Sequence, residues 1–124
     1  MKIYLNENGL PEFEVDVVGK NKSCTLKGLI DTGSTDCACL FKVITTLQIK
    51  PVEYTRYQTL GGISRRRTLV YDVMIGYEDH LVRVPIIRVQ EMPEGIDVIL
   101  GMSFLQHSVV TINEDNMEIE WKET

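Results

Sequence analysis

Long apolar runs are missing from this sequence of 124 residues. No stretch approaches the roughly 18 apolar residues that a membrane-spanning helix needs. The opening residues also lack the apolar core of a signal peptide, because Asn6-Glu7-Asn8 follows at once on a short start. We therefore expect no membrane partner and a cytoplasmic location.

A basic surplus is also missing, since the formal net charge is −5. Phosphate contacts need a basic surface, so this balance argues against nonspecific nucleic-acid binding and predicts no nucleic-acid partner. One local exception is the run Arg65-Arg66-Arg67. Solvated charge on an edge hairpin is the usual explanation for such a run and is favoured here. A preference for acidic substrates is the more specific alternative.

Cysteine is scarce and odd in number, with Cys24, Cys37 and Cys39 as the only three. Cys37 and Cys39 are too close along a predicted strand to form a disulfide with each other, so reduced thiols are expected. Together with His80 and His107 they lack the paired spacing of a zinc site, and buried thiols are common in protein cores. The sequence therefore predicts no metal and no cofactor.

Short β-branched stretches, interrupted by glycine, proline and asparagine roughly every eight to twelve residues, predict an all-β protein with one domain over residues 1–124. A short helix is expected near the C-terminus, at 104–107 with Ser103 as its cap, and 41–48 is predicted as a short helix or a turn. The predicted strands are 13–18, 23–30, 37–40, 54–60, 67–75, 80–89, 96–100, 109–112 and 117–121.

Asp31 stands out because it follows an apolar strand directly and lies in the tight turn Asp31-Thr32-Gly33-Ser34. A glycine in such a turn permits backbone geometry that other residues resist. The backbone N–H groups near Gly33 and the hydroxyls of Thr32 and Ser34 are available to hold the carboxylate. Taken alone, the tripeptide Asp-Thr-Gly is also an ordinary turn sequence.

Three separated segments, in order and spacing, resemble the retroviral-type (retropepsin-like) aspartic peptidases, and in particular their single-domain bacterial and cellular members. They are Leu29 to Ser34, Leu60-Gly61-Gly62-Ile63-Ser64, and Asp97 to Leu105. The resemblance implies a closed, barrel-like acid-protease fold, formed by one lobe. It also implies that Asp31 is catalytic, and that Leu60, Gly61, Gly62, Ile63 and Ser64 form a flap that closes over a bound peptide. The segment from Asp97 to Leu105 is similar to the apolar strand, glycine and short helix that support the active-site loop in this family.

Aspartic peptidases need two carboxylates about 3 Å apart that share one proton. This chain contains one Asp-Thr-Gly and has no room for a second lobe, so a homodimer would have to supply the second Asp31. The predicted function is therefore hydrolysis of peptide bonds in peptide or protein substrates by a homodimer. A catalytically silent dimerisation or peptide-binding module with the same fold is the alternative.

Two further residues, Asp97 and Trp121, each have two possible roles. Asp97 is a second acid beside an apolar strand, and a structural hydrogen-bonding role is favoured over a catalytic one. Trp121 alternates with Met117 and Ile119 on one face of a predicted strand, which fits either core packing or a dimer contact.

Overall fold

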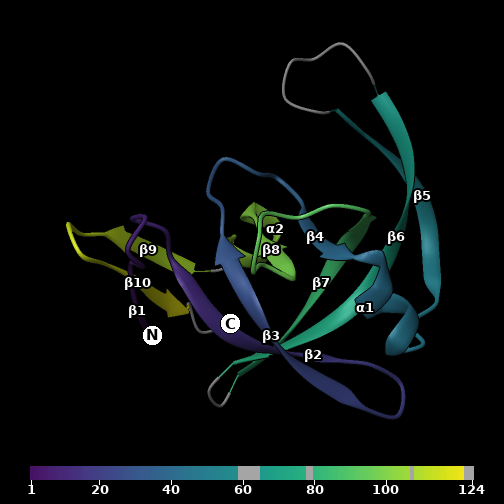
Figure 1. The fold of residues 1–124 in the computed structure, drawn as a ribbon, viewed down its shortest axis with the longest axis horizontal. Helices are drawn as coiled ribbons and strands as arrows, with labels where there is room; N and C mark the ends of the chain where they lie inside the picture. The colour runs from purple at the N-terminus through teal and green to yellow at the C-terminus, as the bar shows by residue number, and fades with distance from the viewer. Residues whose placement is uncertain (59–64, 78–79, 107, 122–124) are drawn as a thin grey trace.

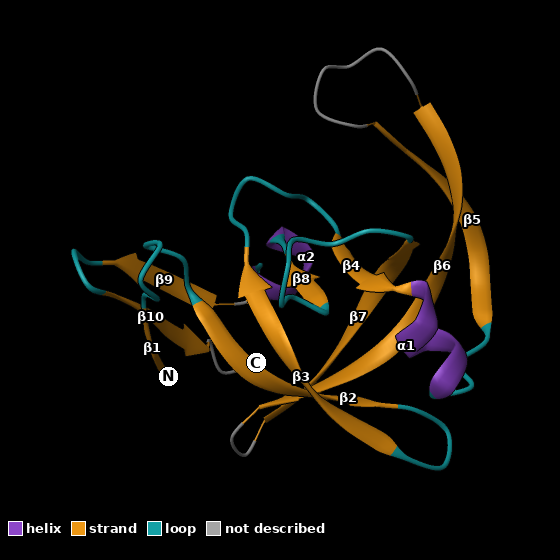
Figure 2. Ribbon diagram, in the orientation of Figure 1, coloured by secondary structure: helices purple, strands orange, loops and turns teal. Residues whose placement is uncertain are grey.

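The computed structural model describes residues 1–58, 65–77, 80–106 and 108–121 of the chain. Leu60 to Ser64 and His107 lie outside these described residues, and so do the expectations attached to them. The elements in chain order are β1 (Lys2–Tyr4), β2 (Glu12–Val18), β3 (Ser23–Ile30), β4 (Cys37–Leu40), α1 (Phe41–Thr46), β5 (Pro51–Gln58), β6 (Arg65–Tyr77), β7 (His80–Val89), β8 (Val98–Leu100), α2 (Met102–Leu105), β9 (Ser108–Ile112) and β10 (Asn116–Trp121). Strands dominate, which confirms the all-β prediction (Figure 2).

The larger sheet has the strand order β2-β3-β8-β4-β7-β6-β5. It closes into a barrel because β2 also pairs with β6, and β5 continues the sheet beyond that closure as one side of the long arm in Figure 1. Most pairings are antiparallel, but β3 pairs with β8 and β4 pairs with β7 in parallel. The predicted barrel-like closure is confirmed.

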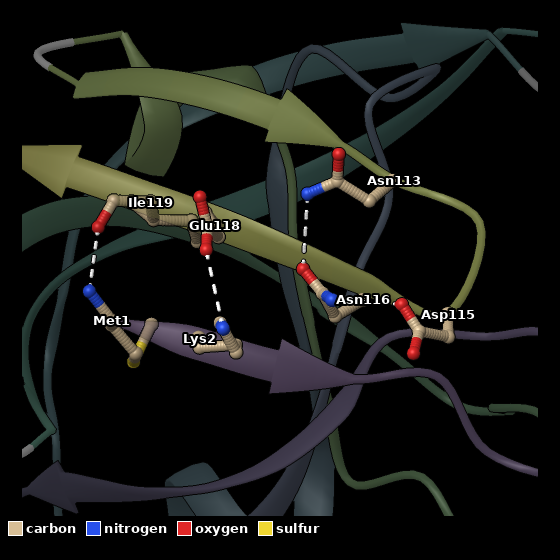
Figure 3. A network of polar contacts seen from close by, with 7 residues as sticks. All are labelled: Met1, Lys2, Asn113, Asp115, Asn116, Glu118 and Ile119. Carbon is tan, nitrogen blue, oxygen red and sulfur yellow. Dashed lines mark hydrogen bonds and ion pairs between the residues drawn. The ribbon is translucent and has the colours of Figure 1, made fainter.

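A smaller sheet combines the two ends of the described chain in the order β1-β10-β9. The N-terminal ammonium of Met1 donates a hydrogen bond to the Ile119 carbonyl at 2.8 Å, and Lys2 forms an ion pair with Glu118 at 3.4 Å (Figure 3). Strand β1 was not among the predicted strands, because three residues give too short a pattern to detect.

The core lies inside the barrel and beneath the smaller sheet, and it follows from period-two alternation in the strands. In β2, Val15 and Val17 are each 1% exposed while the residues between and beside them face outward. Met117 and Ile119 of β10 point into the same core, and Trp121 packs edge-on against the fully buried Phe104 with ring centroids 5.2 Å apart. Core packing is therefore the role of this face of β10.

Both helices are short; α1 lies within the segment 41–48 that was expected as a helix or turn, and α2 begins two residues before the expected 104. Helix α2 begins at Met102 with Gly101 as its N-cap, so Ser103 lies inside the helix and does not cap it. Helix α1 forms directly after β4 and buries Val43 and Ile44. One helix was expected with a second segment left as helix or turn, and two are present. Among the described residues, no helix has both the length and the apolar character needed to cross a bilayer.

Candidate active site

Asp31 is the first residue after β3, at the point where the chain leaves the barrel. Ile30, the last residue of β3, is opposite Leu100 on the parallel strand β8. The backbone N–H of Asp31 continues this pairing by donating to the Leu100 carbonyl at 3.0 Å. The backbone of the acid is therefore fixed by the sheet, while its side chain is half-buried at the end of the barrel.

Backbone groups of the turn that follows Asp31 bind its carboxylate. The Gly33 N–H donates to Asp31 Oδ1 at 3.0 Å, and the Ser34 N–H donates to the Asp31 carbonyl at 3.2 Å. A hydrogen bond to a carboxylate is stronger than one between neutral groups, so the side chain is oriented as well as the backbone. Thr32 and Gly33 are exposed at the tip of the turn.

The hydroxyl of Ser34 has a different partner from the one its position suggests. It donates to the backbone carbonyl of Asp36 at 2.9 Å rather than to Asp31. Ser34 therefore stabilises the shape of the loop, and the carboxylate receives its hydrogen bond from Gly33.

Helix α2 supports this loop from the C-terminal part of the chain. The Met102 N–H donates to the Ser34 carbonyl at 2.8 Å, and the Ser103 N–H donates to the Thr35 carbonyl at 3.0 Å. These are first-turn amides, which have no partner within a helix and need one elsewhere. The loop that carries Asp31 and the start of α2 thus satisfy each other's backbone groups.

Gly101 makes this close approach possible. A Cβ built on it would lie 2.5 Å from the Ser34 carbonyl oxygen and would also collide with the Asp36 carbonyl oxygen. Its φ is −96°, which any residue can adopt, so the requirement here is for space. The glycine in the sequence Leu-Gly-Met marks the point where two backbone segments touch.

Neither the known protein-family models nor the curated protein sequences match this chain. Solved structures do. A retropepsin-like aspartic protease from Rickettsia conorii aligns over 98% of this chain and 90% of its own, with a TM-score of 0.66 and 16% sequence identity. The protease of EIAV, solved with an inhibitor, aligns over 82% and 89% with a TM-score of 0.61 and 21% identity. The chain has the retropepsin-like fold.

The protease of a simian foamy virus agrees with this result at a TM-score of 0.53, with 17% identity over 77% of this chain and 91% of its own. At these identities the comparisons establish the retropepsin-like fold and leave activity and residue roles to be proposed. The resemblance noted from three sequence segments is confirmed at the level of fold, over most of the chain.

The thiols near the site are buried in the barrel and free of disulfides. Burial raises the pKa of Cys37, whose Sγ lies 3.3 Å from the Ser103 hydroxyl. Burial, reinforced by the Asp97 carboxylate, raises the pKa of Cys39 to about 12. Both thiols are therefore protonated at neutral pH, and the thiolate that nucleophilic or metal chemistry needs is absent from these two positions. No group of three or more metal-ligating side chains occurs within the described ranges.

Asp97, the acid just before β8, connects neighbouring strands of the barrel. Its Oδ2 accepts the Lys27 N–H at 3.4 Å, its own N–H donates to the Lys27 carbonyl at 3.0 Å, and its carbonyl accepts from the Leu40 N–H at 3.3 Å. It also lines a cavity of about 610 Å³ that does not include Asp31. These contacts support the structural role that the sequence favoured.

Sequence reasoning found the acid and its turn, and the resemblance of the segment from Asp97 to Leu105 implied that this segment supports the active-site loop. The structure shows that support, because the Ser103 N–H binds the Thr35 carbonyl and Gly101 lies against the Ser34 carbonyl. The individual hydrogen bonds were not predicted, since they join residues that are about 70 positions apart along the chain.

Proposed function

We propose that this protein is an aspartic endopeptidase that works as a homodimer, with Asp31 of each copy forming the catalytic pair. The observation that carries the proposal is the Asp31 carboxylate, half-buried at the end of a barrel strand and held at 3.0 Å by the Gly33 N–H. Support comes from the retropepsin-like fold in which this loop occurs.

The chemistry follows from two like charges held close together. Two carboxylates about 3 Å apart cannot both ionise, so the pair retains one proton. The ionised carboxylate removes a proton from a water molecule, whose oxygen attacks the peptide carbonyl carbon. The protonated carboxyl transfers its proton toward the substrate, and the amide nitrogen leaves as an amine when the C–N bond breaks. No metal or cofactor takes part in these steps.

A second copy is required because the sequence contains one Asp-Thr-Gly. Two-fold symmetry is the simplest arrangement that brings identical acids to one axis. Thr32 is exposed next to Asp31, where it can contact the loop of the partner across that axis. In this proposal the 124 residues act as one catalytic domain.

The remaining parts of the proposal concern substrate access and location. Leu60, Gly61, Gly62, Ile63 and Ser64 would form the flap over a bound peptide, on the strength of their sequence resemblance, since they lie outside the described residues. The substrate class is peptides or proteins, without a nucleic-acid or membrane partner. The three free cysteines support a cytoplasmic location.

Replacing Asp31 by asparagine tests the assignment directly. Asparagine keeps the size of the side chain and can still accept the Gly33 hydrogen bond, but it cannot take up a proton from water. We expect cleavage of a peptide library, followed by mass spectrometry, to fall by several orders of magnitude in Asp31→Asn, with the fold and the dimer retained.

Asp97→Asn is the matched control, because it makes the same chemical change at an acid with a structural role. It should leave the cleavage rate within a few-fold of the wild type. Near wild-type cleavage by Asp31→Asn would refute the catalytic assignment, whereas an inactive but peptide-binding wild type would identify the silent binding module instead.

A further inference from the structure

We propose that one face of the arm formed by β5 and β6, the face to which Arg56, Arg65 and Arg67 belong, recognises acidic side chains of the peptide substrate. Cleavage is then favoured where Asp or Glu lies near the bond that is cut. The arm comprises residues 54–58 of β5 and 65–69 of β6, which pair with each other. This inference rests on the proposed function and adds the chemical class of the substrate.

The arm differs from the rest of the chain in its charge. Residues 54–69 contain four of the six arginines of the sequence, with no lysine and no acid. The whole chain has 13 basic and 18 acidic residues, so the part outside 54–69 holds nine basic residues against all 18 acids. Solubility depends on the net charge of the whole protein and does not explain a concentration of positive charge in one hairpin.

The register of the arm places like charges opposite each other. Arg56 of β5 is directly opposite Arg67 of β6, and Gln58 is directly opposite Arg65. Opposite residues of an antiparallel pair lie on the same face, and like charges at such positions destabilise the pairing. Solvated charge on an edge, the explanation favoured from the sequence alone, requires no such pairing. A role in binding an anion does require it.

Elsewhere the described strands combine opposite charges. Lys2 of β1 is opposite Glu118 of β10 and forms an ion pair with it at 3.4 Å (Figure 3). Arg83 of β7 donates a hydrogen bond to Asp72 of β6 at 3.0 Å, between neighbouring strands. The arm departs from this pattern, because the sequence offers no acid within 54–69 that could pair across it.

Alternation along β6 identifies the face on which these positions lie. Val73 and Ile75 are buried in the barrel core, and Asp72 between them is exposed. Residues two apart on a strand share a face, so positions 65, 67 and 69 belong to the same face of β6 as Val73. Arg56 shares this face because it is opposite Arg67. We call it the inner face of the arm, and position 66 belongs to the outer face.

The position of the arm connects its inner face to the acid. In Figure 1 the arm extends past the barrel toward the top of the view, and the loop between β3 and β4 extends in the same direction. Asp31 is the first residue of that loop. The inner face of the arm continues the face of β6 that lines the barrel core, and the proposed function holds the peptide between the arm and Asp31. Side chains of the peptide near the cut bond would therefore lie beside positions 56, 65 and 67.

Arginine suits the recognition of a carboxylate. Its planar guanidinium presents donors in a fixed fork that matches the two oxygens of a carboxylate, and in a peptide these belong to Asp and Glu. A phosphate offers similar oxygens. A nucleic acid, however, needs an extended basic surface, and the chain outside the arm is acidic. An acidic peptide is therefore the ligand that these charges favour.

The first measurement is the sequence preference of the wild-type protein. A peptide library is digested, and mass spectrometry identifies the residues on both sides of each cut. We expect Asp and Glu to be enriched near the cut bond. In the best-cleaved peptide, replacing these Glu residues by Gln should lower kcat/KM about five- to tenfold, because Gln keeps the shape but loses the charge. The difference should shrink at high salt, which screens exposed charges.

Arg67→Glu tests the inner face, and Arg66→Glu is its matched control. The two residues are neighbours and the charge changes by the same amount, but position 66 is opposite Tyr57 on the outer face. Arg67→Glu also places opposite charges across the arm, so its pairing is retained. We expect Arg67→Glu to abolish the preference for the Glu peptide over the Gln peptide, and Arg66→Glu to leave that preference within about twofold of the wild type.

A reversal of the preference is the stronger test. The double variant Arg56→Glu/Arg67→Glu keeps like charges opposite each other and changes only their sign. It should cleave a peptide that carries Lys in place of Glu faster than the original acidic peptide, because the unfavourable pairing is now with the acid. A variant that still prefers the acidic peptide would overturn the inference.

Binding to Asp31→Asn, measured by fluorescence anisotropy with the labelled acidic peptide, separates this inference from the proposed function. Binding that depends on Arg67, together with a wild type that cleaves no peptide, would overturn the peptidase and support the arm as an acidic-peptide site. Equal cleavage of the Glu and Gln peptides by the wild type would overturn the inference and leave the peptidase intact.

Two further outcomes would also contradict the inference. Equal effects of Arg66→Glu and Arg67→Glu would overturn the assignment to the inner face. A single-stranded DNA oligonucleotide that binds Asp31→Asn more tightly than the acidic peptide, and loses affinity in Arg67→Glu, would overturn the peptide as the ligand of these arginines. If Arg67→Glu does not fold, the comparison of Glu and Gln peptides on the wild type still decides.

Discussion

The barrel and the smaller sheet of this protein end in different ways. The barrel closes on itself through the β2–β6 pairing, so its strands hold one another in a fixed arrangement. The smaller sheet stops at β1 on one side and at β9 on the other within the described chain. The acid is carried by the closed part, where paired strands fix the geometry, whereas the smaller sheet keeps two edges within the described chain.

Burial follows the same division. Ile75 and Ile86 of the barrel are fully buried, whereas Val109 and Ile112 of β9 remain about half or more exposed at 49% and 63%. Burying an apolar side chain contributes about 1.5–3 kcal/mol, so the barrel residues have already made their contribution and the β9 residues have not. The difference shows that the barrel strands have buried their apolar side chains, whereas β9 keeps apolar surface exposed to solvent.

The largest expected effect comes from filling the space at Gly101, inside the closed part. Gly101→Ala would force a Cβ against two carbonyl oxygens of the Asp31 loop, and we expect a loss of about 3 kcal/mol or more in unfolding free energy. Gly9→Ala is the control, because Gly9 has φ +76° but no neighbour within 4 Å, and should cost only about 1–2 kcal/mol. Urea denaturation measures both, and equal losses would show that the contact at Gly101 is not tight.

The next effect is a pH dependence of the barrel. Burial, with a contribution from Asp97, raises the pKa of Cys39 from 9.0 to about 12, so the folded state keeps a thiol proton that the unfolded state loses. This contribution to stability is fully present below about pH 9 and is lost as the pH rises from 9 toward 12, by about 1.4 kcal/mol per pH unit.

We therefore expect the unfolding free energy of the reduced wild-type protein to fall between pH 9 and pH 10.5 more steeply than that of Cys39→Ala. The slopes of unfolding free energy against pH are compared, rather than the free energies themselves, because the substitution also removes buried atoms and so lowers stability at every pH. Parallel slopes would show that the thiol is accessible to water in the folded protein.

The smallest effect, a factor of two, concerns the shared site. If wild-type and Asp31→Ala chains are unfolded, combined in equal amounts and refolded, random pairing leaves about one quarter of the dimers with both acids. Total activity should be about half that of the same wild-type chains refolded alone, because inactive partners take half of them. Unchanged activity with hybrids demonstrably formed would mean that one Asp31 is sufficient.

Much of the barrel was predictable because its strands alternate and end at turn residues. β2, β3, β4 and β7 lie within a residue of the predicted ranges, and Asp31 was identified from its place after β3. These features are local, so a single segment contains the whole signal. The Gly33 N–H was likewise correctly expected as a donor to the carboxylate.

The parts that could not be predicted depend on contacts between distant segments. β1 forms because β10 offers it a partner, and its three residues have no pattern of their own. Helix α2 begins two residues early because its first amides bind Ser34 and Thr35, which overrides the capping preference of Ser103. The hydroxyl of Ser34 binds Asp36 for a similar reason, since the shape of the loop decides which acceptor it can reach.

The parallel pairing of β3 with β8 also sets the order of events during synthesis. Gly28 is opposite Val98, so β3 emerges from the ribosome about 70 residues before its neighbour in the sheet. The amide hydrogen bond from Asp31 to Leu100 and the support from α2 both come from this late segment. A nascent chain that has not yet released residues 98–105 therefore lacks these hydrogen bonds to the loop around Asp31, which delays the formation of the acid site until this later segment has been made.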